Sequence, residues 1–284
     1  MSTILVTGAG GQLGREMKVI ADAFPQYDFL FVTKDDLPLD DFTAVKNYFT
    51  QHKIHWCVNC AAYTAVDKAE TEIDKAYRIN ADAVGNLATV CKEHHVRLIH
   101  ISTDYVFDGT NTTPIKEDQA TNPIGVYGAS KLKGEQLALQ NDPSTMIIRT
   151  SWVYSSFANN FVKTMLRLMK EKESINVVND QRGCPTYAAD LANVIMQIIA
   201  SGITPTKNIF NYSNAGVINW HEFALAIKEL SNSACIVNPI PTSQYPTPAK
   251  RPHYSVLDTS SICETFNITI PFWKDSLIKC LSLL

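Results

Sequence analysis

The segment TILVTGAGGQLG, residues 3–14, decides the fold of this chain. A short apolar run rich in β-branched residues leads directly into a glycine-rich loop, and a helical pattern starts inside that loop. A strand that passes through glycines into a helix gathers backbone amides and the positive end of the helix dipole at one point, which suits a phosphate group. The glycines are not spaced as a strict G-x-G-x-x-G. A simple tight turn would also contain such glycines. We predict a dinucleotide site instead because these glycines lie between a strand and a helix. The candidate residues are Gly8, Gly10, Gly11, Gln12, Leu13 and Gly14.

The same alternation of strand and helix continues through the first half of the chain. Apolar runs predict strands at 3–7, 28–33, 55–59, 97–103 and 145–150. Apolar residues three and four apart predict helices at 12–23, 43–52, 70–94 and 127–140. Strands that are apolar on both faces and joined by helices predict right-handed crossovers. The expected fold class is α/β, a Rossmann-like doubly wound parallel sheet.

After Trp152 the pattern becomes looser. We expect helices at 160–172 and 190–200 and a strand at 208–212. The proline-rich segment 238–252 favours an ordered surface loop over a helix or a central strand. We therefore predict a dinucleotide-binding Rossmann domain over 1–152, with segments near 175–212 returning to it, and a smaller substrate-binding lobe formed mostly by 153–284.

The composition bears on three questions: whether the protein binds nucleic acid, whether it spans a membrane, and whether it is secreted. The 284 residues are 45% hydrophobic and carry 25 basic against 28 acidic side chains. This balance does not predict a nucleic-acid partner, and no stretch approaches the roughly 20 apolar residues of a membrane span. Seven cysteines, an odd number and mostly isolated, argue against a secreted disulfide framework. The expected location is the cytoplasm.

The second predicted strand ends about 20 residues beyond the glycines. In Rossmann proteins the residue at this position contacts the 2′ group of the adenosine ribose. Asp35 suits the free 2′-hydroxyl of NADH, and Lys34 suits the 2′-phosphate of NADPH. A solvated polar turn explains both residues equally well. The sequence leaves the choice between NADPH and NADH open.

Tyr127 and Lys131 lie four residues apart on a predicted helix and therefore share one face. A nearby ammonium favours the phenolate and lowers the pKa of a phenol. Such a phenol is a usable acid for protonating a carbonyl oxygen while hydride reaches its carbon. By itself a Y-x-x-x-K spacing is a weak signal, because an exposed helix face explains most such pairs.

Other polar residues follow the ends of predicted strands. Thr103 and Asp104 end the strand at 97–103, and the segments 59–64 and 151–152 follow two other strands. Ligands of open α/β sheets bind beyond the carboxyl ends of the strands, so one edge is expected to collect these groups with the glycine loop. Thr103 is placed to hydrogen-bond a carbonyl oxygen, and Asp104 to accept hydroxyl groups of a sugar. This convergence gives the Tyr127–Lys131 pair its weight.

These residues together resemble the extended short-chain dehydrogenases/reductases that act on nucleotide sugars. The resemblance runs nearly end to end, through GAGGQLG at 8–14, NCAAYTAVDKAE at 59–70, STDYVFDG at 102–109, YGASKLKGE at 127–135, RTSWVY at 149–154, DQRGCPTYAADLA at 180–192 and AKRPHYSVLD at 249–258. It implies reduction of the C4 ketone of dTDP-4-dehydro-β-L-rhamnose with hydride from NADPH or NADH.

The resemblance also implies roles for single residues. Tyr127 would donate the proton, Lys131 would hold the nicotinamide ribose and depress the phenol pKa, and Thr103 would orient the keto oxygen. The substrate would further contact Asp104, Trp152 and Arg251, the last through the diphosphate. Ala61, Ala62 and Tyr63 would join the glycine loop around the cofactor. Some relatives form homodimers that share Mg²⁺, but no metal ligands can be mapped onto this chain.

Two other functions fit the same fold. Dehydratases place two acidic residues after the active-site threonine, whereas Tyr105 follows Asp104 here; simple epimerases are harder to separate. A non-catalytic NADP-binding regulatory subunit, like that of methionine adenosyltransferase, would act by association alone. The presence of Thr103, Tyr127 and Lys131 favours catalysis.

Overall fold

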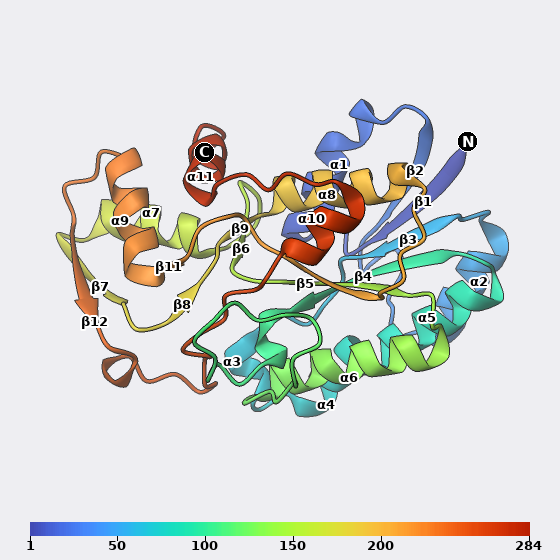
Figure 1. Cartoon of the computed structure of the whole chain (residues 1–284), viewed down its shortest axis with the longest axis horizontal. Coiled ribbons are helices and arrows are strands. Elements are labelled where there is room, and N and C mark those ends of the chain that lie inside the picture. Colours follow the sequence, from blue (N-terminus) through green and yellow to red (C-terminus); the bar gives the residue numbers. More distant parts are fainter.

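The computed structural model describes residues 1–284 and contains a six-stranded parallel sheet at its centre (Figure 1). The strand order is β10-β5-β4-β3-β1-β2. The strands span Ser2–Thr7 (β1), Tyr27–Val32 (β2), Trp56–Asn59 (β3), Arg97–Thr103 (β4), Met146–Thr150 (β5) and Ile209–Tyr212 (β10). The order reverses between β1 and β3, because β1 leads to β2 on one side and β3 lies on the other. Ligand sites of doubly wound sheets form at such a switch point.

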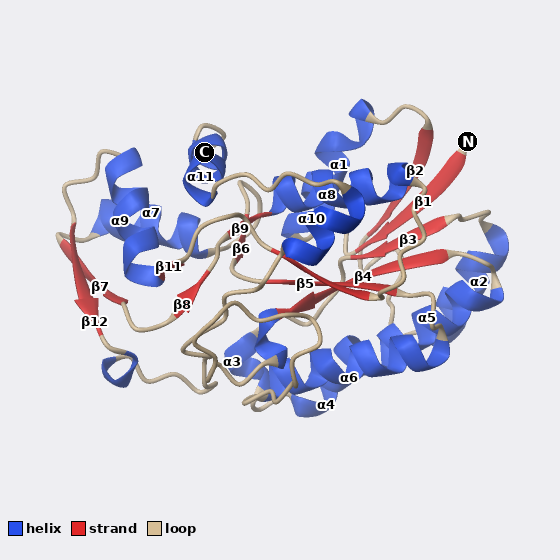
Figure 2. Ribbon diagram, viewed as in Figure 1, coloured by secondary structure: helices blue, strands red, loops and turns tan.

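Helices cover both faces of this sheet (Figure 2). One face packs against α1 (Gln12–Ile20), α8 (Ala188–Ser201) and α10 (Ser260–Phe266). The other packs against α2 (Phe42–Gln51), α5 (Ala83–Glu93) and α6 (Val126–Asn141). Alternate strand residues enter the apolar layers on the two faces of the sheet: Ile4 and Val6 face the first group of helices, and Leu5 faces the second. Burial on both faces explains why the strands are continuously apolar.

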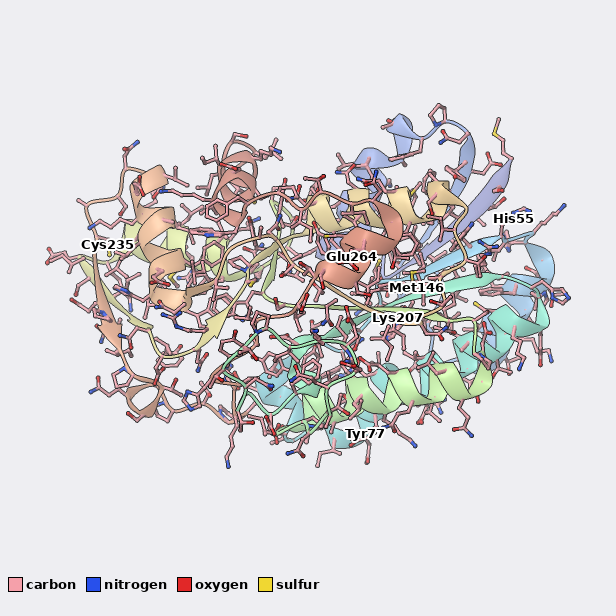
Figure 3. All side chains as sticks on the ribbon, viewed as in Figure 1. His55, Tyr77, Met146, Lys207, Cys235 and Glu264 are labelled. Carbon is pink, nitrogen blue, oxygen red and sulfur yellow. The ribbon has the colours of Figure 1, made fainter.

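A second core lies beside the sheet. It is built from α7 (Phe161–Glu171), α9 (Trp220–Leu230), α11 (Trp273–Leu281) and the parallel pair β7 (Ser174–Val178) and β12 (Ile236–Ile240). His55, just before β3, and Cys235, just before β12, mark opposite ends of the long axis (Figure 3). Two pairs of short strands also belong to this part of the molecule: β6 (Val153–Tyr154) with β9 (Thr186–Tyr187), and β8 (Arg182–Gly183) with β11 (Ile218–Asn219). Tyr154, Tyr187 and Ile218 from these strands are buried in the second core.

The expected α/β class and parallel sheet are confirmed, with differences in detail. The helix predicted over 70–94 is present from Ile73 to Glu93, but it passes through a π-helical segment at Arg78–Asp82 that separates α4 (Ile73–Tyr77) from α5. A short helix, α3 (Val66–Ala69), precedes it. Short 3-10 turns follow α1, β4 and β12 at Ala21–Ala23, Asp104–Val106 and Thr242–Gln244. The proline-rich segment is not wholly loop, because Pro239 lies inside β12. A two-stranded sheet tolerates a proline since both of its strands are edges.

The later half contributes unequally to the large sheet. The segment from α8 to β10 returns to it, whereas β7 pairs with β12 in the second core. The division into 1–152 and 153–284 therefore stays a prediction. No helix in this structure combines the length and the apolar character that crossing a membrane requires.

Candidate active site

A cleft of about 850 Å³ opens where β1, β3, β4 and β5 end. Its walls include most of the residues that the sequence singled out, although they come from segments far apart in the chain. The lining residues include Gly8, Gly10, Gly11, Gln12, Leu13, Lys34, Asp35, Ala61, Ala62, Thr103, Asp104, Tyr127, Lys131 and Trp152. Gly14, Tyr63 and Arg251 are not among them.

The glycine loop brings the end of β1 into contact with the end of β3. Gly8 has φ +66°, and a Cβ there would lie 2.6 Å from the backbone nitrogen of Ala61. Gly14 serves packing instead of the cleft, since a Cβ on it would lie 2.5 Å from the carbonyl oxygen of Gly8. Helix α1 begins after Gly11 without a side-chain cap, so its first backbone amides remain free to bind an anion. This cradle fits the phosphates of a dinucleotide.

The turn after β2 presents both candidate ribose-reading residues to the cleft. Asp36 accepts hydrogen bonds from the backbone nitrogen and hydroxyl of Thr33, at 2.9 and 2.7 Å, and so holds the turn. Lys34 and Asp35 both line the cleft. The choice between NADPH and NADH therefore stays open.

Tyr63 is turned away from the cleft, contrary to the expectation of a cofactor contact. Its side chain is buried, and its hydroxyl donates to Oε2 of Glu72 at 3.1 Å. Its backbone nitrogen donates to Oδ1 of Asn80, within the π-helical segment, at 2.8 Å. Tyr63 thus fixes the loop after β3, while Ala61 and Ala62 face the cleft.

Helix α6 carries Tyr127 and Lys131 into the cleft wall. Its first residue, Val126, donates its backbone N–H to Oε1 of Glu70 at 2.9 Å, which fixes the start of the helix. Lys131 is fully buried, and its Nζ donates to the carbonyl oxygen of Ile101 at 2.7 Å. The Glu70 contact could not be foreseen, because the two residues lie 56 positions apart.

The acidity of Tyr127 differs from the expectation. Burial raises its pKa to about 12, the side chain of Thr103 acts to lower it and the charge of Asp104 to raise it. Burial lowers the pKa of Lys131 to about 8, although the negative charge of Glu135 opposes this. The pKa of Tyr127 therefore lies above that of a free phenol, because desolvation of the phenolate dominates, and its depression by Lys131 stays a prediction. In the resting site Tyr127 keeps its proton.

Thr103 and Asp104 end β4 next to Tyr127. The hydroxyl of Thr103 donates to Oδ1 of Asp104 at 3.0 Å and accepts from the backbone nitrogen of Tyr105 at 3.2 Å. Asp104 is only 2% exposed, and its Oδ2 has no hydrogen-bond partner. Burial raises its pKa to about 6, although the nearby hydroxyl groups of Ser255 and Thr103 act to lower it. An unpartnered buried carboxyl oxygen at a cleft wall is suited to a hydroxyl donor of a ligand.

Trp152 also lines the cleft, in a strained backbone conformation. Its φ is +48°, which is rare for a bulky residue and frequent at functional sites. Its indole stacks on Trp220, with ring centroids 3.6 Å apart and planes 11° from parallel. Trp220, on α9, was not foreseen, because nothing in its local sequence marks it as a neighbour of Trp152.

Arg251 is held outside the cleft. Its guanidinium forms an ion pair with Asp67 at 2.9 Å and is 25% exposed. It also donates to the hydroxyl of Thr247 and the carbonyl oxygen of Ala249, the latter at 3.0 Å. Arg251 thus ties the proline-rich segment to α3, and its contact with the substrate diphosphate stays a prediction. No group of three or more His, Cys, Asp or Glu side chains is placed to hold a metal ion, so the expectation of magnesium finds no support.

A parallel sheet with a glycine loop at its switch point and a Tyr–Lys pair in the same cleft defines the short-chain dehydrogenase/reductase class. The family model for the RmlD substrate binding domain matches residues 1–284, and the chain belongs to this family. Three relatives illustrate the similarity.

The dTDP-4-dehydrorhamnose reductase of Aggregatibacter actinomycetemcomitans is 39% identical over 98% of this chain and 97% of its own length. The structure of the dTDP-4-dehydrorhamnose reductase of Clostridium acetobutylicum superposes with a TM-score of 0.94 at 39% identity, covering 99% of each chain. That of Bacillus anthracis, in complex with NADP, has a TM-score of 0.94 at 37% identity and covers all of both chains.

Proposed function

We propose that this protein reduces the C4 ketone of dTDP-4-dehydro-β-L-rhamnose to dTDP-β-L-rhamnose, with NADPH or NADH as the hydride donor. One observation carries the proposal: Thr103, Asp104, Tyr127 and Lys131 line the same cleft as the glycine loop. The names of full-length relatives and the NADP in the Bacillus anthracis structure supply the substrate and the cofactor.

A bound nicotinamide dinucleotide would supply the hydride; the chain's own residues would manage the proton and hold the sugar. Tyr127 donates its phenolic proton to the keto oxygen as the alcohol forms. Its high pKa keeps that proton in place until the much more basic alkoxide develops. Thr103 positions the keto oxygen beside this hydroxyl, Asp104 accepts a sugar hydroxyl, and the indole of Trp152 covers the apolar face of the deoxysugar.

The cofactor would lie between the glycine loop and the end of β3. The free amides of α1 would hold its diphosphate, and Gln12, Leu13, Ala61 and Ala62 would contact its nucleotides. Lys131 would hold the nicotinamide ribose. A nucleotide-sugar substrate is the proposed partner, and a homodimer stays a prediction. All seven cysteines are free, which supports a reducing location such as the cytoplasm.

The test is oxidation of NADPH or NADH, followed at 340 nm, with dTDP-4-dehydrorhamnose. A reductase consumes one cofactor per product, whereas an epimerase consumes none and a binding subunit shows no turnover. We expect Tyr127→Phe to lower kcat at least about a hundredfold, within the range of general acid catalysis, while cofactor binding survives.

Tyr105→Phe is the matched control. The ring of Tyr105 packs edge-on against that of Tyr127 with centroids 5.5 Å apart, yet Tyr105 does not line the cleft. Its hydroxyl can be removed by the same chemical change, and turnover should stay within a few-fold of the parent. Normal turnover by Tyr127→Phe would refute the assignment of the proton donor. If the parent protein oxidises less than one cofactor for each product formed, the proposed reaction is refuted.

A further inference from the structure

Behind Lys131 lies a buried row of polar side chains on three neighbouring strands. Thr7 of β1 pairs in register with Asn59 of β3, and Asn59 pairs in register with His100 of β4. All three side chains are at most 1% exposed, as is that of Lys131. Polar groups buried this deeply need fixed hydrogen-bond partners, so the direction of each bond can be worked out.

The amide of Asn59 has only one orientation that satisfies its neighbours. Its Oδ1 accepts from the backbone nitrogen of Ala61 at 3.1 Å and from the hydroxyl of Thr7 at 2.7 Å. A backbone N–H can only donate, so the NH₂ group cannot occupy that side. Nδ2 therefore faces Nδ1 of His100, at 3.0 Å.

The orientation of Asn59 fixes the tautomer of His100. An amide NH₂ can only donate, so Nδ1 of His100 must accept and carries no proton. Burial lowers the pKa of His100 well below its usual value, and the charge of Lys131 adds to this. The ring is therefore neutral, with its single proton on Nε2. Nε2 lies 3.3 Å from Nζ of Lys131.

The Nε2–H of His100 can donate to a neutral amine but not to an ammonium, which has no lone pair. We propose that Asn59 and His100 act as a tautomer lock, in which His100 is a positioning residue that presents an N–H to Lys131 and favours its neutral amine. The amine donates to the carbonyl oxygen of Ile101 and accepts from His100. This proposal rests on the proposed function, in which Lys131 holds the nicotinamide ribose. It adds that His100 influences whether Lys131 carries its proton.

Two other titratable groups face Lys131. Glu135, one turn further along α6, favours the ammonium through its charge. Burial raises the pKa of the Cys60 thiol, after β3, so that this thiol stays protonated and uncharged near neutral pH. Glu135 is itself tied to Arg149 by an ion pair at 2.7 Å and accepts from the hydroxyl of Ser102 at 2.5 Å. Tyr127 shares the cleft. The lock and burial must therefore outweigh the charge of Glu135 for Lys131 to lose its proton near neutral pH.

Nitrogen-15 NMR of the histidine rings tests the lock directly in the unmodified protein. We expect His100, assigned by loss of its signals in His100→Gln, to show a protonated Nε2 and an unprotonated Nδ1 between pH 6 and 9. A proton on Nδ1, or a charged ring, would overturn the proposal whether or not the protein is a reductase.

The pH dependence of kcat/KM tests the consequence. Reduction leaves a phenolate at Tyr127, so the ammonium form of Lys131 is the active one and activity falls as Lys131 loses its proton. An aspartate at position 59 would accept from Ala61, Thr7 and the Nδ1–H of His100, which reverses the tautomer. In Asn59→Asp the fall of kcat/KM at high pH, the basic limb of the pH profile, should move up by at least one pH unit. The ratio of kcat/KM at pH 9.5 to kcat/KM at pH 7 should therefore rise about tenfold.

Two further variants separate the lock from other effects. His100→Leu removes the N–H without adding a charge and should also move the basic limb upward. Thr7→Val removes one of the two donors to Oδ1 but leaves Ala61, so the limb should stay in place. An unmoved limb in His100→Leu refutes the lock, whereas a protein with the expected tautomer but no reductase activity refutes only the proposed function.

Discussion

The buried ion pair between Glu135 and Arg149 allows a quantitative test of how the site is supported. Oε2 of Glu135 accepts from Nη2 of Arg149 at 2.7 Å, and Oε1 accepts from Nε at 3.0 Å. The two side chains are only 2% and 3% exposed. Glu135→Leu leaves the guanidinium buried with the carbonyl oxygen of Glu117 and the ring of Phe107 as its remaining contacts.

An uncompensated buried charge of this kind costs about 3–5 kcal/mol. That is a large part of the roughly 5–15 kcal/mol by which a domain is stable. The free energy of unfolding, from urea titration followed by circular dichroism, should therefore fall by this amount in Glu135→Leu. The double variant Glu135→Leu/Arg149→Met should regain most of the loss, because an apolar pair of similar volume replaces both charges.

The exposed pair of Arg167 and Glu171 is the matched control. It has a similar separation, 2.8 Å, but its side chains are 60% and 52% exposed. Glu171→Leu should change stability by about 0.5 kcal/mol or less, as for other pairs one turn apart on a helix surface. A loss below about 1 kcal/mol in Glu135→Leu, or no recovery in the double variant, would refute the reasoning from burial.

Two further predictions concern the cleft. Lys34→Ala should raise KM for NADPH about tenfold and leave KM for NADH little changed. Asp35→Ala should raise KM for NADH and leave KM for NADPH little changed. Equal effects on both cofactors would show that neither residue contacts the 2′ position of the adenosine ribose. Because the pKa of Asp104 is raised to about 6 in the folded state, the native protein binds the extra proton between about pH 4 and 6. Stability from this group is thus lost as pH rises. The stability of Asp104→Asn relative to the parent should therefore be about 2.4 kcal/mol higher at pH 7 than at pH 4. The same difference at both pH values in urea titrations would contradict this.

Local sequence was sufficient for the elements of the sheet and for most of the cleft. The glycine loop, Thr103 and the Tyr127–Lys131 pair were predicted from strand ends and helical spacing, and the structure brings them to one edge. These predictions work because the carboxyl ends of parallel strands must meet. The π-helical turn within the 70–94 helix was not predicted, since the contacts of Asn80 with Tyr63 and Ser130 involve distant residues.

The sequence by itself determined the order of strands and helices and the chemical groups at the end of each strand, because these depend on neighbours within a few residues. Tertiary structure alone decided which way those groups point and what protonation they hold. It turned Tyr63 inward, engaged Arg251 with Asp67, and placed His100 beside Lys131. Desolvation and hydrogen-bond direction depend on every group packed around a side chain, and those groups come from all parts of the chain.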